Sequence, residues 1–235
     1  MAGIKGNQYP GRELEAMSFA PKYHQWILDE FGPYLGQTVV EVGAGVGNLT
    51  TMLLQTELSH LYAFEPAANL FPSLKAKMEG LSRVSVINDY FCAAHVPDAI
   101  DSVLYINVLE HIEDDREALM NTYQALRTGG HLLLFVPALE WLFSEADVEV
   151  GHYRRYNMKN ISKVIDNIGF NIEKIRFFDL AGVLPWYVNF VLLKNSFNSS
   201  SVALYDRLVV PPMQFFEKFI DPPVGKNILL IARKD

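Results

Sequence analysis

The feature that most constrains the fold is a glycine-rich turn that joins a short apolar run to a helical segment. Residues 39–47 read Val-Val-Glu-Val-Gly-Ala-Gly-Val-Gly, and the apolar residues before the glycines are typical of a buried strand. Glycines let the backbone turn tightly and approach a ligand without an intervening Cβ atom. Because ligands in open α/β sheets bind at the carboxyl ends of the strands, we expect a binding site at this turn.

Short strand-like runs alternate with helical segments around this turn, which predicts a parallel sheet covered on both faces. Beyond residue 137 the pattern changes to a loop, a helix, a strand, an aromatic- and proline-rich insertion at 179–226, and a final strand. The predicted strands are 38–42, 61–64, 84–87, 102–106, 131–136, 171–178 and 227–233. The predicted helices are 21–32, 48–56, 67–79, 116–126 and 159–168, with the glycine pair at 129–130 as the stop signal of the fourth.

The acidic residue before the glycines narrows the choice of ligand. The dinucleotide fingerprint G-x-G-x-x-G/A, started at Gly43, requires glycine or alanine where this chain has Asn48. Glu41 is also a poor neighbour for a pyrophosphate, but it suits a cationic ligand. S-adenosylmethionine carries a sulfonium and an ammonium group and no phosphate, so we predict that it binds here. The predicted contacts in this turn are Glu41, Gly43, Ala44, Gly45, Gly47 and Asn48.

Further polar residues follow the next two predicted strands. Glu65 ends the second strand and is followed by Pro66, and an acid at this place can accept hydrogen bonds from both ribose hydroxyls. The alternative is that Glu65 precedes a helix, whose dipole favours a negative charge. After the third strand, Asp89 is predicted to bind the adenine amino group and Tyr90 or Phe91 to cover the ring, with an Asx turn as the alternative for Asp89.

Together these pieces resemble the class I S-adenosylmethionine-dependent methyltransferases. The resemblance covers roughly residues 35–140 and rests on the Glu-x-Gly-x-Gly-x-Gly turn, Glu65, Asp89 and the segment Ile-Asn-Val-Leu-Glu-His-Ile at 106–112. It implies a Rossmann-like α/β fold with a seven-stranded, mostly parallel sheet in the order 3-2-1-4-5-7-6, the last strand antiparallel, and helices on both faces. We expect one domain over residues 1–235, with the N-terminal helical segment 1–34 covering the cofactor cleft.

The segment after the fourth strand is similar to small-molecule O-methyltransferases, including those of ubiquinone synthesis. In the latter a glutamate precedes Val-Leu-Glu-His and helps to bind magnesium, but here that position is Asn107. Because one carboxylate ligand is missing, we predict no metal, and Glu110 and His111 are alternatively a helix-entry acid and its neighbour. Asn107 and Val108, at the tip of the strand, are expected to contact the methionine part of the cofactor.

The loop sequence Gly-His-Tyr-Arg-Arg-Tyr holds the candidates for catalysis. A branch of these enzymes that is tied to glycan, lipid or envelope biosynthesis has a similar motif. We expect His152 to deprotonate or orient an acceptor hydroxyl, because histidine titrates near neutral pH. Arg154 or Arg155 would bind an anionic group on the acceptor. The alternative is structural, with the arginines paired to Asp147 or Glu149 so that they hold the loop in place.

The composition of the chain favours some classes of binding partner and some cellular locations over others. The net charge is −7, which argues against nucleic-acid binding because that requires basic surface. The single cysteine, Cys92, fits a reducing, cytoplasmic location. The longest apolar run, 180–193, is shorter than the ~20 residues of a membrane span. The insertion at 179–226 is predicted to be a helical cap, a homodimer contact, or a lid for an apolar acceptor at a membrane surface.

These observations predict an enzyme that transfers the methyl group of S-adenosylmethionine to a small-molecule acceptor, with oxygen as the acceptor atom. The acceptor is expected to be apolar or linked to a glycan or a lipid. One alternative is a nicotinamide-dependent oxidoreductase, against which Asn48 and Glu41 count. The other is a non-catalytic module that binds S-adenosylmethionine, against which the complete glycine turn and its acids count.

Overall fold

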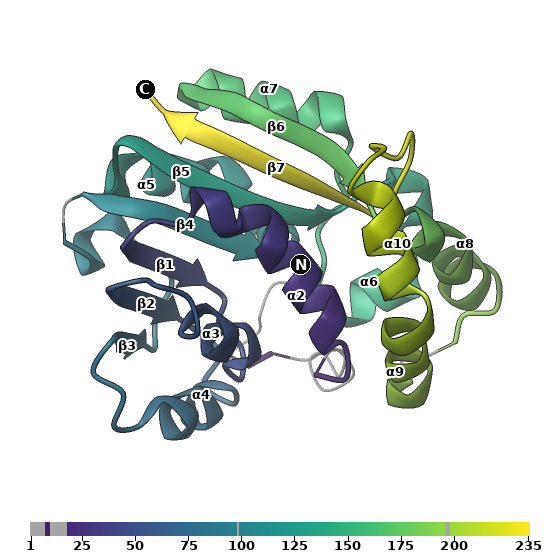
Figure 1. Cartoon of the computed structure of the whole chain (residues 1–235), viewed down its shortest axis with the longest axis horizontal. Coiled ribbons are helices and arrows are strands. Elements are labelled where there is room, and N and C mark those ends of the chain that lie inside the picture. Colours follow the sequence, from purple (N-terminus) through teal and green to yellow (C-terminus); the bar gives the residue numbers. More distant parts are fainter. Residues whose placement is uncertain (1–7, 10–17, 98, 196–197) are drawn as a thin grey trace.

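Seven strands form one mixed sheet in the computed structural model, which describes residues 8–9, 18–97, 99–195 and 198–235. The strand order is β3-β2-β1-β4-β5-β7-β6, with β7 antiparallel to both of its neighbours and the other pairs parallel (Figure 1). The predicted fold class and strand order are confirmed. The strands are β1 (Thr38–Val42), β2 (His60–Phe64), β3 (Val84–Ile87), β4 (Ile100–Ile106), β5 (Leu126–Pro137), β6 (Phe170–Phe178) and β7 (Asn227–Lys234).

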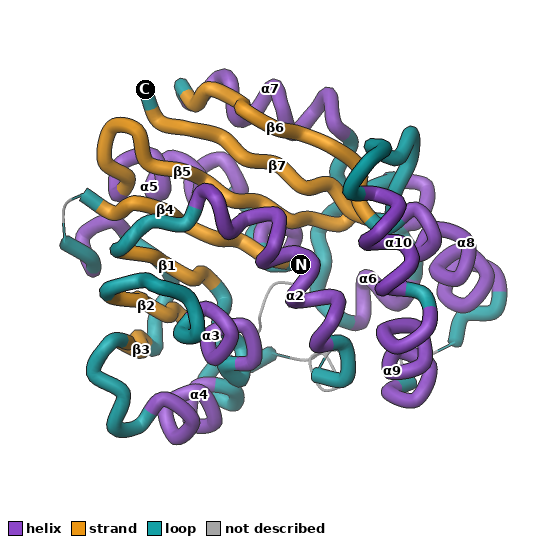
Figure 2. Tube along the Cα trace, in the orientation of Figure 1, coloured by secondary structure: helices purple, strands orange, loops and turns teal. Residues whose placement is uncertain are grey.

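Helices cover both faces of the sheet (Figure 2). The α-helices are α2 (Pro21–Phe31), α3 (Asn48–Leu53), α4 (Phe71–Met78), α5 (Asp115–Ala125), α6 (Glu145–Glu149), α7 (Met158–Ile168), α8 (Val183–Trp186), α9 (Ser199–Leu208) and α10 (Val210–Glu217). Helices α5 and α7 pack on one face and α2 and α3 on the other. Short 3₁₀ or π segments are η1 (Gly32–Tyr34), η2 (Ala93–His95), η3 (Leu109–His111), η4 (Glu140–Leu142), η5 (Leu180–Gly182) and η6 (Tyr187–Leu192).

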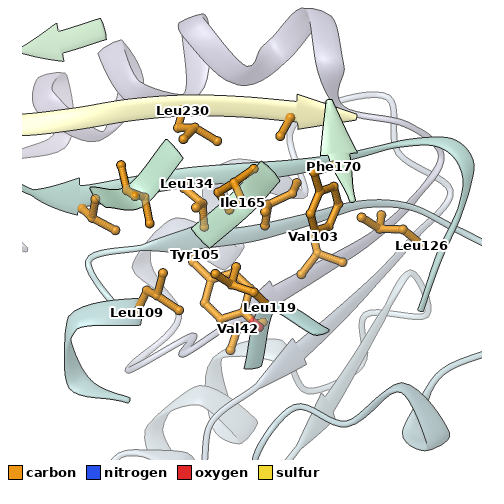
Figure 3. Packing of buried hydrophobic residues seen from close by; sticks show 14 of the residues in the cluster. Val42, Val103, Tyr105, Leu109, Leu119, Leu126, Leu134, Ile165, Phe170 and Leu230 are labelled. Atoms are coloured by element: carbon orange, nitrogen blue, oxygen red, sulfur yellow. The ribbon is translucent and has the colours of Figure 1, made fainter. Parts of the chain in front are cut away.

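The core explains why the strands read as continuous apolar runs. Val39 and Val40 of β1 are both fully buried, although neighbouring side chains of a strand point to opposite faces of the sheet. Val40 joins the cluster beneath α5 and α7, which also contains Leu134 and Leu230 (Figure 3), and Val39 joins the cluster beneath α2. A strand covered by helices on both faces has no solvent-facing side, so alternation of polar and apolar residues is absent.

Several helix boundaries differ from the predicted ones: α3 ends at Leu53 rather than at residue 56, and two others differ for identifiable reasons. α4 begins at Phe71 rather than at residue 67, because Pro72 lacks a backbone N–H and is tolerated in a first helical turn but not further along. α5 ends at Ala125, and the predicted glycine stop lies within β5 instead. The pairing of β4 and β5 shifts register there, and a Cβ atom on Gly130 would meet three backbone oxygens at 3.0–3.1 Å. Glycine thus permits the backbone of β5 to lie close against β4 at the register shift and does not end the helix.

The insertion at 179–226 forms helices that gather beside the end of the sheet where β5 finishes (Figure 1). Asn198 caps α9 by accepting hydrogen bonds from the backbone N–H groups of Ser200 and Ser201. No helix within the described residues is both long and apolar enough to cross a lipid bilayer. The predicted N-terminal segment is described only in part, since residues 1–7 and 10–17 lie outside the described residues, and α2 and η1 account for the remainder.

Candidate active site

The glycine turn between β1 and α3 has a backbone conformation that glycine adopts most readily. Gly43, Gly45 and Gly47 have φ angles of +73°, +57° and +82°, in the left-handed region where a side chain costs energy. A Cβ atom on Gly43 would lie 2.6 Å from Cγ2 of Val108. The turn therefore brings main chain directly against the segment that follows β4, at the carboxyl ends of the two central strands.

The side chain of Glu65 braces this turn from the end of β2. Its two carboxylate oxygens accept hydrogen bonds from the backbone N–H groups of Gly45 (2.7 Å) and Ala67 (2.8 Å). Burial raises the pKa of this carboxyl, and the two hydrogen bonds oppose the rise. The helix-entry alternative does not describe this position, because α4 begins only at Phe71. Each oxygen has a second lone pair that can accept a hydrogen bond from a ligand hydroxyl.

Glu41, in β1, is a buried acid that the described residues satisfy only in part. Its side chain is only 2% exposed, and Oε2 accepts no hydrogen bond from the described residues. Desolvation raises the pKa of Glu41 to about 7, with a small further rise from Glu65 and an opposing effect of Thr50. Glu41 lines a cavity together with the glycine turn. A cation in that cavity would stabilise the carboxylate, so this acid fits the ammonium group of S-adenosylmethionine.

Two adjoining cavities meet at the glycine turn. The larger, of about 820 Å³, extends toward β2 and β3 and is lined by Glu65, Pro66, Tyr90 and Phe91. The smaller, of about 180 Å³, lies on the side of Glu41. The residues that line both are Tyr9, Val42, Gly43, Gly45, Asn107 and His111. Such a bipartite cleft can hold a nucleoside in one part and an amino-acid part in the other.

The remaining predicted cofactor residues lie in different places. Asn107 has a φ angle of +52°, lines both cavities, and accepts a hydrogen bond from the side chain of Asn227 (3.3 Å). Val108 lines the larger cavity. Asp89 lines neither cavity as the described residues form them, and its exposed carboxylate accepts a hydrogen bond from the backbone N–H of Tyr90 (2.8 Å). This bond goes to the next residue and not to the residue two positions on, so it is not the Asx turn named as the alternative. The adenine contact of Asp89 stays a prediction.

Of three further predicted residues in the glycine turn, two line the cleft and one lies between helices. Ala44 and Asn48 line the smaller cavity, and the side-chain oxygen of Asn48 accepts a hydrogen bond from Lys77 (2.9 Å). Gly47 lies where α3 begins, and a Cβ atom there would be 2.9 Å from Cδ1 of Leu74 in α4. This last glycine therefore allows α3 and α4 to pack closely.

The loop after α6 brings His152 to the smaller cavity. Its Nδ1 lies 2.8 Å from Oδ1 of Asp147, and its Nε2 lies 3.8 Å from Oε1 of Glu110. Asp147 is held in turn by the backbone N–H of Ser144, which caps α6 (2.9 Å). An acid bonded to one ring nitrogen sets the orientation and tautomer of the imidazole, so the other nitrogen is available to a ligand.

Both arginines of this loop form ion pairs. Arg155 is only 4% exposed, contacts Asp147 at 2.9 Å, and lies 4.4 Å over the ring of Trp186. Arg154 pairs with Asp115 at 2.8 Å. The pairing of Arg155 with Asp147 is the one that the structural alternative specified, although Arg155 also lines the smaller cavity.

Several residues of the smaller cavity were not predicted from the sequence. Lys226 lies 5.0 Å over the ring of Tyr23 and 3.2 Å from Asp179, and Tyr23 donates a hydrogen bond to Asn227 (3.1 Å). These contacts join α2 to the start of β7, and no spacing in the sequence indicates them. The unpredicted lining residues include Tyr9, Tyr23, His24, Trp186, Lys226 and Asn227.

Comparison with known proteins agrees with this geometry. Residues 40–132 match the family model of a methyltransferase domain. An uncharacterized methyltransferase of Geobacillus kaustophilus is 34% identical over 111 residues, which are 46% of this chain and 50% of the relative. One of Bacillus mycoides is 26% identical over 125 residues, covering 52% and 57%. The chain thus spans about half the length of the curated relatives it matches.

Solved structures share the fold at low sequence identity. A chain of the Haloferax volcanii complex between the Trm112 methyltransferase activator and a methyltransferase has a TM-score of 0.65 at 14% identity, over 95% of this chain and 93% of that one. The Synechocystis magnesium protoporphyrin IX methyltransferase with bound S-adenosylmethionine has a TM-score of 0.53 at 14% identity, over 94% and 80%. Haemonchus contortus phosphoethanolamine N-methyltransferase 2 has a TM-score of 0.59 at 20% identity, over 90% and 52%.

The sheet has the fold of solved methyltransferase structures, and the segment 40–132 within it matches a methyltransferase domain. Residues 40–132 are accordingly similar to methyltransferase domains, and one of the solved structures that share the fold contains bound S-adenosylmethionine.

Proposed function

We propose that this chain transfers the methyl group of S-adenosylmethionine to an oxygen atom of a small-molecule acceptor. The observation that carries the proposal is that one cavity has the glycine turn and Glu41 on one wall and His152, held by Asp147, on another. The first wall suits the cationic amino-acid part of the cofactor. The second suits an acceptor group that has to lose a proton.

The residues of the chain supply alignment and proton transfer. Because the methyl group is already activated in the cofactor, proximity and in-line orientation are the main contributions of the protein. In the proposed step, Nε2 of His152 takes the proton of the acceptor hydroxyl as the acceptor oxygen bonds to the methyl carbon. The bond from that carbon to sulfur breaks, and its electron pair stays on sulfur in S-adenosylhomocysteine. Asp147 stabilises the imidazolium that forms.

A further cavity of about 460 Å³ supports an acceptor with an apolar part. This cavity lies against the insertion and shares Tyr23, Trp186 and Lys226 with the smaller cavity of the cleft. Its wall combines aromatic and apolar side chains with amides and hydroxyls: Pro185, Trp186, Phe190, Val202, Asn189, Asn195, Asn198 and Ser201. We infer an apolar acceptor that carries a polar group, such as a glycan- or lipid-linked one.

The proposal also assigns roles to the two arginines and names the partners of the chain. Arg155 holds Asp147 in place, and the side chain of Arg154, 29% exposed, is the one we assign to an anionic group of the acceptor. Exposed apolar residues on the insertion, including Phe215 and Phe219, fit either a homodimer contact or a peripheral membrane contact. A small molecule as acceptor, no nucleic acid, and a cytoplasmic location remain predictions.

The topology counts against the nicotinamide-dependent alternative. Dinucleotide-binding sheets have the order 3-2-1-4-5-6, whereas here the antiparallel β7 lies between β5 and β6. A thermal-shift assay with S-adenosylhomocysteine and with NADH tests the choice. We expect only S-adenosylhomocysteine to raise the melting temperature, by the equivalent of about 2.7 kcal/mol at a hundred times its Kd. Stabilisation by NADH instead would overturn the proposal, and binding without turnover would favour the non-catalytic module.

The base is tested with tritium-labelled cofactor and a panel of hydroxylated glycan and lipid acceptors. We expect His152→Ala to lower turnover by about 10²–10⁴-fold and to leave the affinity for S-adenosylhomocysteine within about twofold, because His152 lies on the acceptor side. His95→Ala, at an exposed histidine outside the cleft, is the matched control. Full turnover of His152→Ala on the accepted substrate would exclude the base.

A further inference from the structure

Three side chains with metal-binding atoms converge on the acceptor side of the cleft. Glu110 and His111 come from η3, and His152 comes from the loop after α6. One potential ligand atom from each lies within 4.8 Å of the other two. The backbone ties the two segments together, since the N–H of Tyr153 donates to the carbonyl of Glu110 (2.8 Å). The convergence therefore belongs to the fold and does not depend on flexible side chains alone.

The carboxylate of Glu110 has no hydrogen-bond partner among the residues that the structure describes. Its side chain is fully buried, and neither oxygen accepts a hydrogen bond from another described residue. Among the described basic groups, Nε2 of His152 lies 3.8 Å from Oε1 of Glu110. Asp147, equally buried, contrasts with it, because Asp147 accepts from His152, from Arg155 and from Ser144. A buried charge without partners is costly, so the environment of Glu110 calls for a cation.

The ring of His152 is held as the rings of metal-binding histidines usually are. Nδ1 of His152 lies 2.8 Å from Asp147, and the imidazole of His111 lies beside the backbone of Val150 and Gly151. Metal-binding histidines commonly donate one ring N–H to a carboxylate or a backbone carbonyl, which fixes the ring and makes the other nitrogen a better ligand. The two rings meet edge to face, with their centroids 4.6 Å apart.

We propose that Glu110, His111 and His152 bind one divalent transition-metal ion, with Zn²⁺ the favoured species. Two imidazoles and one carboxylate are a ligand set typical of zinc and of other first-row metals, whereas magnesium prefers oxygen ligands. The expectation of no metal rested on Asn107, but the third ligand of this site comes from a different segment, the loop that carries His152. With neutral histidines, Glu110, Asp147 and Arg155 leave the site one negative charge, which a cation compensates.

The site has an open side, because all three residues line the smaller cavity. Three protein ligands and one free position are the arrangement of catalytic zinc sites. Its catalytic part rests on the proposed methyl transfer: an ion here would lower the pKa of an acceptor hydroxyl. His152 would then act as a ligand and not as the proton acceptor. Metal binding itself requires no acceptor and can be measured without turnover.

The direct test is calorimetric titration of the chelator-treated full chain with Zn²⁺, together with elemental analysis of the untreated protein. We expect one ion per chain, and roughly 100-fold weaker binding in His111→Ala and in Glu110→Gln. His95→Ala, at the exposed histidine used above, should bind as the parent does. Co²⁺ in place of Zn²⁺ should give a visible absorption spectrum that Glu110→Gln abolishes.

Folding is separated from binding by the same variants. Glu110→Gln removes a buried charge without partners, so we expect it to unfold at a temperature no lower than that of the parent. Zn²⁺ binding that is absent in the parent, or unchanged in Glu110→Gln, would overturn the metal site. S-adenosylhomocysteine should bind with or without Zn²⁺, so failure of the metal site is distinguishable from failure of the proposed function. Turnover that is unaffected by Zn²⁺ removal would overturn the catalytic part of this inference and leave His152 as the base.

Discussion

The two sides of the cleft are built in different ways. The cofactor side, from β1 to the end of β4, is held by main chain: glycines with positive φ angles and a carboxylate, Glu65, that accepts two backbone hydrogen bonds. The acceptor side is held by side chains from distant segments, with Arg155 on Asp147 and on Trp186, and Lys226 over Tyr23.

This difference indicates which side of the cleft tolerates changes in sequence. A backbone cradle depends on few residues, each with a steric requirement, so it tolerates little change. A wall of paired side chains can change with the acceptor while the sheet remains as it is. The sequence match to other methyltransferases also falls on the cofactor side. It covers residues 40–132 and does not include the loop and the insertion that complete the acceptor side.

The largest expected effect is a loss of ligand affinity at Gly43, where the glycine turn packs tightly against Val108. In Gly43→Ala the new Cβ atom would lie 2.6 Å from Val108 at a φ of +73°, so both the clash and the backbone strain act on the turn. We expect affinity for S-adenosylhomocysteine to fall by more than about 100-fold, from a distortion costing a few kcal/mol. Isothermal titration calorimetry measures this loss.

Gly80→Ala is the matched control, because Gly80 has a similar φ of +79° but open space around its Cβ position. This variant should lose about 1–2 kcal/mol of stability from strain and keep its affinity for the ligand. Equal affinities of Gly43→Ala and the parent would show that the cofactor side does not depend on the close approach to Val108.

The next effect tests the acceptor side through stability. Arg155→Met removes the buried partner of Asp147 and keeps much of the side-chain volume, so we expect a loss of about 3–5 kcal/mol in the free energy of unfolding. Arg154→Met breaks the more exposed pair with Asp115 and should cost less than about 1 kcal/mol. Urea denaturation measures both. Similar losses in the two variants would contradict the view that one buried pair holds this wall.

What could be predicted from the sequence follows the same division. The glycine turn and the position of Glu65 were predictable because each depends on local pattern and on the rule that parallel strands end at one edge, whereas the strand order was implied by the resemblance to a known family. Asp89 shows the limit even there, since an acid after a strand can bind its own backbone as readily as a ligand, and its hydrogen bond to Tyr90 is of that kind.

The acceptor side was less accessible to sequence analysis. The pairing of Asp147 with Arg155 joins residues eight positions apart and could be named as an alternative. The contact of Lys226 with Tyr23 joins residues about two hundred positions apart and depends on how α2 and the insertion meet. Nothing in local periodicity carries that information.

The smallest expected effect is the pH dependence of ligand affinity on the cofactor side. Burial raises the pKa of Glu41 to about 7, so the carboxylate that should receive the ammonium group is about one-tenth ionised at pH 6 and nine-tenths ionised at pH 8. The affinity for S-adenosylhomocysteine should therefore rise about tenfold between these values, and in Glu41→Gln it should be weaker and nearly independent of pH. Calorimetry at both pH values measures the ratio, with Glu79→Gln, an exposed acid at the end of α4, as the control. If the pH dependence of the affinity were unchanged in Glu41→Gln, a group on the acceptor side would set the pH dependence of ligand binding. Glu110, whose pKa burial also raises to about 7, is such a group. The two sides of the cleft would then be electrostatically coupled.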